Sequence, residues 1–482
     1  MMFRDKILSY FKESSSPLLK DLKTGTVLSY QEGLSEIKQI SSVLNQHGIK
    51  KGDRIAVLLD NSVQFLLLYI TCLLGRVVIC PINPKYNKDD VEYCTRLSRV
   101  KKIVTNKHVD GIKIPVIHPE EFTSGKSTSD SLNDIEIGGG YEGDDLFSIT
   151  FTSGTTGRPK AIGHKAEIHL ANANAFNKKV ENDKNQRMHH VMPMFYMAGI
   201  LNTVLCPIEA GGSIVIDASF GPLSPATFWK NFIENGSTTT WLSPTMIQSI
   251  LKLDRDKELL PEIRNRADKL KIFSGTAPLS STSKKEFYDK YNVTLYQSYG
   301  LSETLFVSVK EIGNKDFSNS VGAVMDGIEI TFDSDGEILL DTNYMMAGYL
   351  NQNGQFENEH PRIFRTGDFG KMMDGELYIT GRKKELIIKG GENINPKDIE
   401  TVILKLGFIE SAAVVGYEDE FYGEDIAAFV VSNHSDDEEV RKAIRTICKE
   451  QLMASHTPGK IIFIKEMPLT PTGKIQKKEL PI

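Results

Sequence analysis

The sequence predicts an α/β protein, with a large N-terminal domain of βαβ-type sheets plus a β-rich subdomain and then a small mobile α+β C-terminal domain. Three observations support this prediction. Residues Ile55–Leu59, Val63–Leu74 and Val77–Ile82 have the composition of a strand, a buried helix and a strand, at the spacing of a parallel βαβ unit. Residues 320–380 hold short strands separated by Asp-Gly turns. Residues 382–482 alternate helix and strand patterns in a compact βαββα-like order.

The other elements follow from local patterns along the chain. A helix is expected at Pro225–Glu234, with Ser224 as its N-cap. A charged, glycine-led run begins at Gly381, directly after an expected strand, and suits a hinge, so we place the domains at 1–381 and 382–482. Further strands are expected at Leu146–Phe151, Gly212–Asp217, Thr239–Leu242, Leu270–Phe273, Glu376–Thr380, Ala412–Gly416 and Ile426–Ser432, helices at Pro396–Leu406 and Asp436–Gln451, and a surface loop at about 122–143.

Composition limits the class of protein. The chain has 482 residues, of which 40% are hydrophobic and 25% charged, as in soluble globular proteins of several domains. A net charge of −6 argues against a nucleic-acid partner. The start has no signal-peptide pattern, and the most apolar run, Phe65–Leu74, is about half the length of a membrane span. Five scattered cysteines show no metal spacing and are expected to be reduced core residues, so a cytoplasmic location is expected.

A polar loop follows the expected strand Leu146–Phe151. It reads Thr152-Ser153-Gly154-Thr155-Thr156-Gly157-Arg158-Pro159-Lys160. Two glycines allow sharp turns that aim backbone N–H groups inward, and Lys160 adds a positive charge, which together suit a polyphosphate. The spacing does not match a Walker loop, because no Ser or Thr follows the lysine. The alternative is an ordinary polar surface turn.

The full string from Phe151 to Lys160 resembles the phosphate loop of the acyl-adenylate-forming (AMP-binding) superfamily, which includes acyl-CoA synthetases such as 4-coumarate- or fatty-acid-CoA ligases. The resemblance implies ATP and Mg²⁺ chemistry, and Lys160 among the catalytic residues. A second segment, Gln297–Thr304, is similar to the family's segment that ends in a Thr/Ser-Glu pair. By that resemblance Glu303 holds Mg²⁺ near the phosphates. The alternative for Glu303 is a carboxylate in the first turn of a helix.

Further residues are assigned to the nucleotide by the same resemblance. Ser302 is implied to touch the α-phosphate and Tyr299 to lie against adenine, with Gln297, Ser298 and Gly300 beside them. The turn Ser274–Pro278 looks like the family's adenine-side turn. Phe364–Asp368 is similar to the segment whose aspartate accepts both ribose hydroxyls, and Arg382 would reach the ribose or the phosphates. The implied nucleotide-binding residues of the loop and of these segments are Thr152, Ser153, Gly154, Thr155, Thr156, Gly157, Thr276, Ala277, Pro278, Gln297, Ser298, Tyr299, Gly300, Ser302, Asp368 and Arg382.

The C-terminal part completes the resemblance. Thr472-Gly473-Lys474 matches the family's adenylation lysine, although a lysine in such a tail is ordinarily solvated. Lys384 falls where the family has its hinge residue. Gly390 and Gly391 resemble the loop that lines the CoA pantetheine tunnel. The matching motifs extend from about residue 50 to about residue 475.

One segment departs from the family pattern. Met192–Gly199 places Tyr196 where the family often has histidine, and a tyrosine cannot become cationic near pH 7. Phe195, Tyr196 and Gly199 are expected at the acyl pocket, with Gly199 providing space. Amino-acid-activating relatives have an aspartate in this segment and this chain has none. We therefore expect an uncharged aliphatic or aromatic carboxylic acid as substrate.

The resemblance implies an acyl-CoA ligase that forms acyl-AMP from a carboxylic acid and ATP and then transfers the acyl group to CoA. Two alternatives stay open. The acceptor is a carrier-protein phosphopantetheine in one, and the chain is a catalytically silent nucleotide-binding paralogue in the other, although Glu303, Asp368 and Lys474 are all present. The oligomeric state, including a homodimer, is left open.

Overall fold

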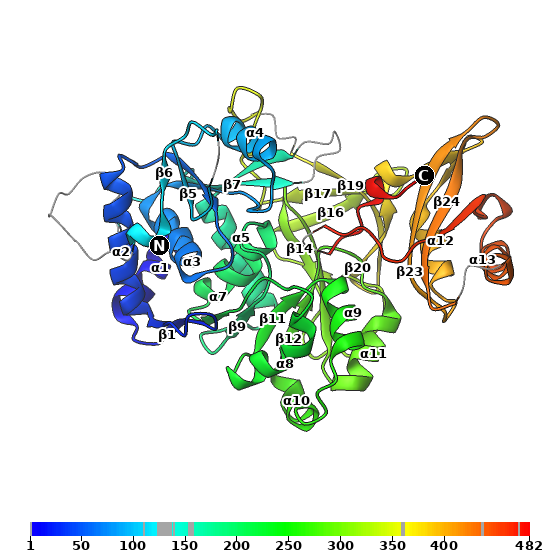
Figure 1. The fold of residues 1–482 in the computed structure, drawn as a ribbon, viewed down its shortest axis with the longest axis horizontal. Coiled ribbons are helices and arrows are strands. Elements are labelled where there is room, and N and C mark those ends of the chain that lie inside the picture. The colour runs from blue at the N-terminus through cyan, green and yellow to red at the C-terminus, as the bar shows by residue number, and fades with distance from the viewer. Residues whose placement is uncertain are drawn as a thin grey trace. The chain divides into compact units, whose positions relative to one another are not determined.

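The computed structural model describes residues 2–108, 111–122, 137, 140–152, 159–357, 362–434, 438–470 and 473–482 (Figure 1). The chain divides into two compact units. The first unit comprises Met1–Ser318, Gly322–Ile328 and Thr342–Arg362, and the second comprises Asn319–Val321, Glu329–Asp341 and Ile363–Ile482. This division groups most of the β-rich subdomain with the C-terminal part. The domain boundary expected after residue 381 stays a prediction.

A seven-stranded sheet in the first unit contains the predicted βαβ unit. Strands β3 (Arg54–Leu58) and β4 (Val78–Pro81) are parallel neighbours, joined by helix α3 (Val63–Gly75). Twelve of the thirteen α3 residues are buried, which explains why its sequence is apolar all round. The sheet order is β18-β8-β7-β4-β3-β5-β6, with β5 Lys102–Thr105, β6 Val116–Ile117, β7 Leu146–Thr152, β8 Lys160–Lys165 and β18 Gly348–Tyr349.

A nine-stranded sheet forms the other layer of the first unit. Its central strands run parallel from β1 through β10, β9, β11 and β12 to β13, and antiparallel strands close both ends. The expected strands of this region are confirmed within one or two residues. The sheet order is β15-β14-β13-β12-β11-β9-β10-β1-β2, with β1 Pro17–Asp21, β2 Val27–Ser29, β9 Arg187–His190, β10 Ser213–Ile216, β11 Thr239–Leu242, β12 Lys271–Ser274, β13 Leu295–Leu301, β14 Leu305–Val309 and β15 Ala323–Val324.

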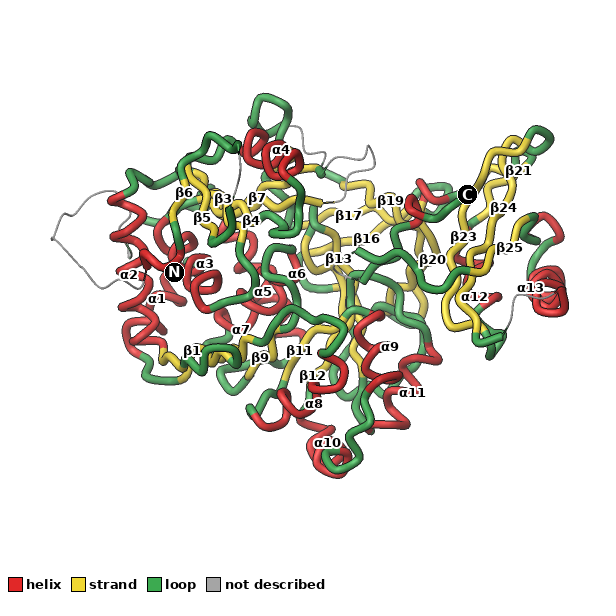
Figure 2. Tube along the Cα trace, in the orientation of Figure 1, coloured by secondary structure: helices red, strands yellow, loops and turns green. Residues whose placement is uncertain are grey.

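Helix α5 (Ala166–Lys179) packs against both sheets, since it contacts β7 and β8 of one sheet and β14 of the other (Figure 2). The Asn172 side chain exchanges two hydrogen bonds with the backbone of Phe306 on β14. The other helices of the first unit are α1 Phe3–Glu13, α2 Tyr30–Gln46, α4 Lys88–Ser98, α6 Met197–Ile200, α7 Cys206–Glu209, α8 Ser224–Glu234, α9 Pro244–Leu253, α10 Leu260–Arg266 and α11 Ser281–Tyr291, with a π-helical turn at Leu201–Leu205.

The predicted cap of α8 is wrong by one position. Leu223 is the N-cap, and Ser224 is already helical. The Ser224 hydroxyl accepts a hydrogen bond from the N–H of Gly221, outside the helix, instead of one from the first turn. Pro225 still lies in the first turn, where its missing N–H costs nothing.

The second unit holds two sheets. The first is antiparallel, with order β16-β17-β19-β20, and follows the Asp-Gly turns seen in the sequence. In the second, Ile426, Ala428 and Val430 of β24 pack with α12 and α13, while Ala427 and Phe429 pack with Met467 and Leu480 of the C-terminal tail. The bounds are β16 Ile328–Phe332, β17 Glu337–Thr342, β19 Phe364–Met373, β20 Glu376–Arg382, β21 Ile387–Lys389, β22 Glu392–Ile394, α12 Pro396–Ile403, β23 Ile409–Asp419, β24 Gly423–Ser432, α13 Glu438–Gln451 and β25 Lys460–Phe463.

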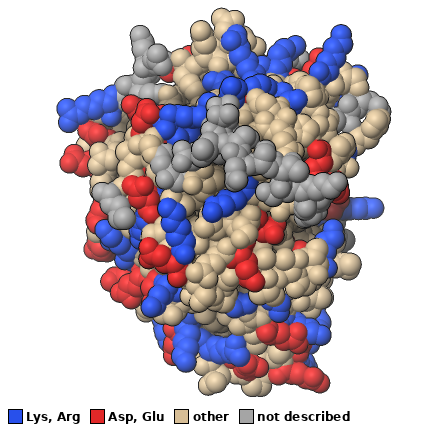
Figure 3. Space-filling model, turned by 90° about the vertical axis from the view of Figure 1, so that its left-hand side faces the viewer, with Lys and Arg blue, Asp and Glu red and all other residues tan. Residues whose placement is uncertain are grey.

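The burial of the cysteines and the mixture of surface charges are as expected from the composition of the sequence. All five cysteines are buried and free, as expected of core residues in a reduced protein: Cys72, Cys80, Cys94, Cys206 and Cys448. On the face shown in Figure 3, lysine and arginine side chains are interspersed with aspartate and glutamate. Within the described part of the chain, no helix combines the length and apolar character that crossing a membrane requires.

Three buried histidines predict a loss of stability in acid. His164 and His169 lie with ring centroids 4.7 Å apart, and His190 bonds Thr203 through Nδ1 at 2.6 Å. Burial lowers the pKa of His164 and of His190 to about 3, and burial lowers the pKa of His169 well below 6.5. Below pH 6.5 the unfolded chain therefore binds protons that the native chain does not. Each histidine should cost about 1.4 kcal/mol of unfolding free energy per pH unit between pH 6.5 and the native pKa.

Urea unfolding measured at pH 8, 6.5 and 5 tests this expectation. Unfolding free energy should fall steeply between pH 6.5 and 5, and His169→Asn should make the fall shallower. His434→Gln is the control variant, because His434 is exposed. An unfolding free energy that does not change from pH 8 to pH 5 would contradict the prediction.

Candidate active site

Several predicted site segments lie at the carboxyl ends of parallel strands in the first unit. Residues 191–196 follow β9, and Gly275–Pro278 follow β12. The segment Gln297–Leu301 belongs to β13 itself, next to β12 in the sheet. Ligands of open α/β sheets bind outside this edge. The fold therefore brings the acid segment, the adenine-side turn and the Glu303 segment to one edge.

The phosphate loop connects β7 to β8, which are antiparallel neighbours. Thr152 and Lys160 are register partners at the two ends of the loop, so their side chains point to the same face of the sheet. Lys160 is exposed and Thr152 is half-buried. The predicted phosphate-binding residues Ser153, Gly154, Thr155, Thr156 and Gly157 lie outside the described residues.

Glu303 lies in the turn between β13 and β14, so the alternative reading as a carboxylate in the first turn of a helix is wrong. Its Oε1 accepts a hydrogen bond from the Tyr349 hydroxyl at 2.6 Å, and its carbonyl accepts one from the N–H of Met346. The Nζ of Lys160 lies 5.1 Å from the centroid of the Tyr349 ring. Tyr349 therefore connects the end of the phosphate loop to the carboxylate expected to hold Mg²⁺.

The Tyr349 hydroxyl is a stable donor to this carboxylate. Burial and the neighbouring Glu303 carboxylate both raise the pKa of Tyr349 above its usual value, so its proton is retained at any physiological pH. The bond orients one carboxylate oxygen of Glu303.

Tyr349→Phe should slow acyl-adenylate formation about 10- to 100-fold, since it removes one hydrogen bond to a charged group, a loss of roughly 1.5–3 kcal/mol. ATP–pyrophosphate exchange measures the effect. Tyr344→Phe is the matched control. Tyr344 lies in the same segment as Tyr349, but its hydroxyl donates a hydrogen bond to the Asp326 carbonyl and not to Glu303. Equal rates for wild type and Tyr349→Phe would remove Tyr349 from the site.

The adenine-side turn is strained. Thr276 adopts a φ of 71°, a left-handed conformation that is rare for a β-branched residue and that clusters at functional sites. Its hydroxyl is buried and has no hydrogen-bond partner within the described residues, and the same holds for Ser274 Oγ, Gln297 Oε1 and Thr304 Oγ1. Buried polar atoms usually have partners. These unpaired oxygens are suited to a polar ligand or ordered water at this edge.

The acid segment is only partly open. Phe195 and Tyr196 pack together with ring centroids 4.5 Å apart, and burial raises the pKa of Tyr196 to about 12. Met192 and Met194 are buried in the core, which leaves Tyr196, Met197 and Ala198 partly accessible.

Gly199 does not leave free space in the acid segment. A Cβ there would lie 2.1 Å from the Pro193 carbonyl oxygen. The glycine is therefore required by close backbone packing. Its predicted role at the acyl pocket has no support from geometry.

The second unit holds Asp368 and Arg382 as direct cross-strand partners on β19 and β20. Asp368 is 2% exposed, and its Oδ1 accepts a hydrogen bond from Arg382 Nε at 2.5 Å. The preceding Gly367 has a φ of 72° and donates its N–H to Glu337 Oε1. Glu337 also pairs with Arg365, so this buried carboxylate holds the Arg-Thr-Gly-Asp segment in place.

Lys384 lies between two tethered neighbours. It occupies the middle of a 3₁₀ turn, Lys383–Glu385. Lys383 Nζ bonds Glu337 Oε2 on β17 at 3.0 Å, whereas Glu385 Oε2 accepts a bond from Lys477 Nζ in the C-terminal tail at 3.1 Å. Because its two neighbours are held by different parts of the second unit, Lys384 is suited to act as a pivot. Its hinge role stays a prediction.

The remaining predicted residues also belong to the second unit. Gly390 and Gly391 form the turn between β21 and β22, with φ values of 60° and 85°. A Cβ at Gly391 would meet nothing within 4 Å, so the turn is open on that side. Lys474 is exposed on the loop that ends the chain, where its N–H bonds Thr470 Oγ1 at 3.0 Å.

Sequence reasoning missed Tyr349 and Glu337. Tyr349 lies in a two-residue strand with no periodic pattern, and Glu337 follows an Asp-Gly turn like any polar strand start.

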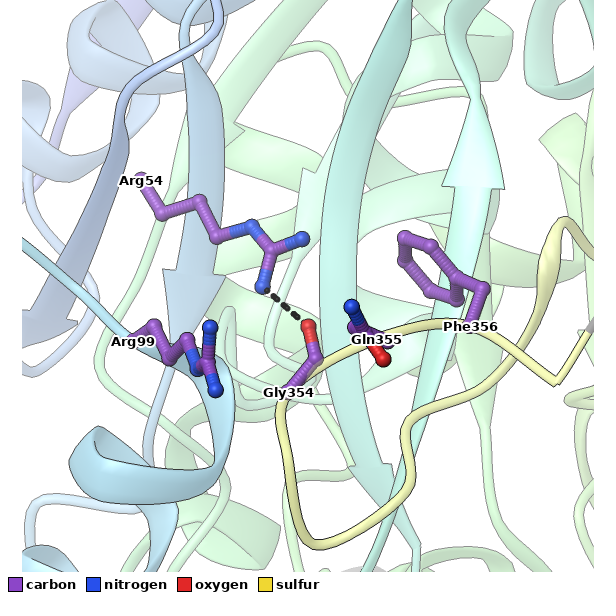
Figure 4. Close-up of a pocket in the computed structure, with 5 residues that line it drawn as sticks. All are labelled: Arg54, Arg99, Gly354, Gln355 and Phe356. Carbon is purple, nitrogen blue, oxygen red and sulfur yellow. Dashed lines mark hydrogen bonds between the residues drawn. The ribbon is translucent and has the colours of Figure 1, made fainter.

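The described residues also contain a hollow of about 580 Å³, lined by Arg54, Arg99 and Gly354–Phe356 (Figure 4). Arg54 begins β3 of the seven-stranded sheet, whereas Thr152 ends β7 of the same sheet, so Arg54 and the start of the phosphate loop lie at opposite ends of their strands.

The geometry thus assembles two groups of predicted residues. In the first unit, Lys160 and Glu303 both contact Tyr349, and Thr152 is the register partner of Lys160. Asp368, Arg382, Lys384 and Lys474 belong to the second unit. Their roles towards a nucleotide stay predictions.

Comparison with known proteins finds relatives in sequence and solved structures of the same fold. The long-chain-fatty-acid–CoA ligase FadD13 of Mycobacterium tuberculosis is 29% identical over 95% of this chain and 93% of its own. The sulfoacetate–CoA ligase of Cupriavidus necator is 26% identical over 96% of this chain and 94% of its own. The crystal structure of ATP-bound MatB from Rhodopseudomonas palustris has the same fold, with a TM-score of 0.86 at 23% identity and coverage of 99% of this chain and 98% of its own.

Two family matches cover most of the chain. Residues 398–474 match the AMP-binding enzyme C-terminal domain. Residues 12–350, well over half of the chain, match the AMP-binding enzyme family. The protein therefore belongs to the AMP-binding enzymes.

Proposed function

We propose that the protein is an AMP-forming acid–thiol ligase. A carboxylate oxygen of the substrate attacks the α-phosphorus of ATP, and pyrophosphate leaves. The thiol sulfur of CoA then attacks the acyl carbonyl carbon, the thiol proton is released, and AMP leaves with both electrons of the broken C–O bond. The observation that supports this most directly is that Lys160 and Glu303 both contact Tyr349, in a chain of this family whose relatives are named CoA ligases.

The site residues supply charge and orientation. Lys160 brings a cation to the end of the phosphate loop, where a leaving pyrophosphate gains charge. Lys474 is proposed to neutralise the meeting anions at the α-phosphate during adenylation. Asp368 is proposed to accept the ribose hydroxyls, and the bond from Arg382 to its Oδ1 helps to orient the carboxylate.

The residues present also fit Mg²⁺. Glu303 offers a hard carboxylate oxygen, and no group of three or more metal ligands occurs among the described residues. Mg²⁺ is typically held by one or two carboxylates together with substrate phosphates, so a single carboxylate suffices. When bound, Mg²⁺ would disperse the charge of the phosphates.

The substrate is proposed to be an uncharged aliphatic or aromatic acid. A buried ammonium requires a nearby carboxylate, and no Asp or Glu occurs in 191–199. Tyr196, Met197 and Ala198 present apolar surface, and methionine adapts to ligands of varied shape. We expect fatty or aryl acids to turn over faster than any amino acid. An amino acid that is best by ten-fold would refute the assignment of the acid class and leave the ligase chemistry standing.

ATP–pyrophosphate exchange over a panel of carboxylic acids, followed by product analysis with CoA, tests the proposed function. Exchange with one acid class and thioester formation with CoA support the proposal. Exchange without transfer to CoA, but with transfer to a phosphopantetheinylated carrier protein, would favour the carrier-loading alternative. Nucleotide binding without exchange for any acid would favour the catalytically silent alternative. The predicted cytoplasmic location stays a prediction.

A further inference from the structure

Residues 468–470 and 473–476, on either side of two residues outside the described part of the chain, pair with each other, and we call this pair of segments the Lys474 hairpin. Gln476 donates its N–H to the Pro468 carbonyl, Thr470 donates its N–H to the Lys474 carbonyl at 2.7 Å, and Leu469 faces Ile475 as an isolated bridge pair. A two-stranded hairpin of this size is marginally stable by itself. The position of Lys474 therefore depends on what holds the base of the hairpin.

Two kinds of contact hold this base. Met467 before the hairpin and Leu480 after it are buried in one apolar cluster on the face of β24 that carries Phe429. Such an apolar cluster holds the base of the hairpin against the sheet. It does not fix the orientation of the hairpin, because the hydrophobic effect is non-directional. The directional contact comes from Lys477, three residues after Lys474.

Lys477 bridges two carboxylates of the second unit. Its Nζ lies 3.1 Å from Glu385 Oε2 and 2.8 Å from Glu400 Oε1, with only 23% of the side chain exposed. Glu400, on α12, also accepts the N–H of Val414 on β23 at 2.8 Å. Burial lowers the pKa of Lys477, but the two carboxylates outweigh burial and leave the pKa above its usual value, so the ammonium stays charged.

We propose that Lys477 is a positioning residue for adenylation, which holds the Lys474 hairpin in place through its ion pairs with Glu385 and Glu400. The proposal rests on the function proposed above for Lys474. A cation on a flexible stem needs a fixed base to reach one point, and a misplacement of about 1 Å costs roughly 10²-fold in rate. Glu385 adjoins Lys384, so the same contact ties the hairpin to the segment directly after the proposed hinge.

Lys477→Met keeps the length of the side chain and removes its charge, and Lys477→Arg keeps the charge. The neighbouring Lys478 is exposed, so Lys478→Met is the matched control. We expect Lys477→Met to lower kcat of pyrophosphate exchange about 10- to 100-fold with KM for ATP within two-fold. Conversion of supplied acyl-AMP and CoA should stay within two-fold. Lys477→Arg should recover most of the exchange, and Lys478→Met should match wild type.

Hydrogen exchange supplies a readout that does not depend on activity. The amides of Thr470, Gly473 and Gln476 should exchange faster in Lys477→Met than in wild type, while those of β24 stay protected. If Lys477→Met does not fold, Glu385→Gln can replace it, because this change weakens one of the two ion pairs. It should speed up exchange of the same hairpin amides, but to a smaller extent.

Three outcomes would overturn the proposal: exchange kinetics and loop amides like wild type in Lys477→Met, an equal loss in Lys478→Met, or an equal loss of both half-reactions with deprotected β24 amides. Absence of pyrophosphate exchange in the wild type would refute the proposed function instead. The amide exchange of the hairpin would still decide whether Lys477 holds it.

Discussion

Lys474→Ala should lose acyl-adenylate formation by about 10²–10³-fold, or roughly 3–4 kcal/mol, and keep thioester formation. The expected reason is that Lys474 meets charge that develops only while carboxylate and α-phosphate react. Pyrophosphate exchange reports the first half-reaction, and supplied acyl-AMP with CoA reports the second.

Lys465→Ala is the control for Lys474→Ala, since Lys465 is an exposed lysine on the same C-terminal stretch. It should leave both half-reactions unchanged. If Lys474→Ala reduces both half-reactions equally, Lys474 does not have the assigned role.

Lys384→Pro should preserve adenylation and slow thioester formation, by about 10²-fold if the acceptor thiol is misplaced by about 1 Å. Proline restricts φ at 384 and disfavours the helical conformation of residue 383, so it should trap one orientation of the segment beyond the pivot. The two half-reactions are measured separately, as for Lys474.

Lys384→Ala distinguishes the backbone from the side chain at this pivot. It removes the amine and keeps φ free, so both half-reactions should stay within about three-fold of wild type if the hinge acts through its backbone. Thioester formation that proceeds normally in Lys384→Pro would refute the hinge.

Local patterns predicted much of the fold, because they depend on a few adjacent residues. The apolar runs around Ile55 and Val77 and the buried helix between them were sufficient to identify a parallel βαβ unit, which the structure confirms. The Asp-Gly turns likewise indicated the β-rich subdomain. Boundaries were less secure, as the cap of α8 shows, since both Leu223 and Ser224 precede the same proline.

Long-range contacts could not be predicted in this way. The bond between Tyr349 and Glu303 joins residues 46 positions apart, and it exists because β18 pairs with β8. The Glu337 carboxylate accepts a hydrogen bond from the N–H of Gly367, about 30 residues away. From the sequence alone, a glutamate directly after an Asp-Gly turn would be expected to be solvated. At Gly199 the sequence suggested space for a ligand. In the structure, the missing side chain instead allows the backbone of Pro193 to pack closely against Gly199.

The buried cysteines make CoA consumption easy to follow. Burial raises the pKa of Cys80 and Cys94 to about 12 and that of Cys448 to about 11, and it raises the pKa of Cys72 and Cys206 well above 9. Thiolates, not thiols, attack a chromogenic disulfide, so the folded protein should be nearly silent towards such a reagent at neutral pH. Colour development would then count free CoA during turnover. In denaturant the same reagent would titrate five protein thiols per chain and so measure the unfolded fraction.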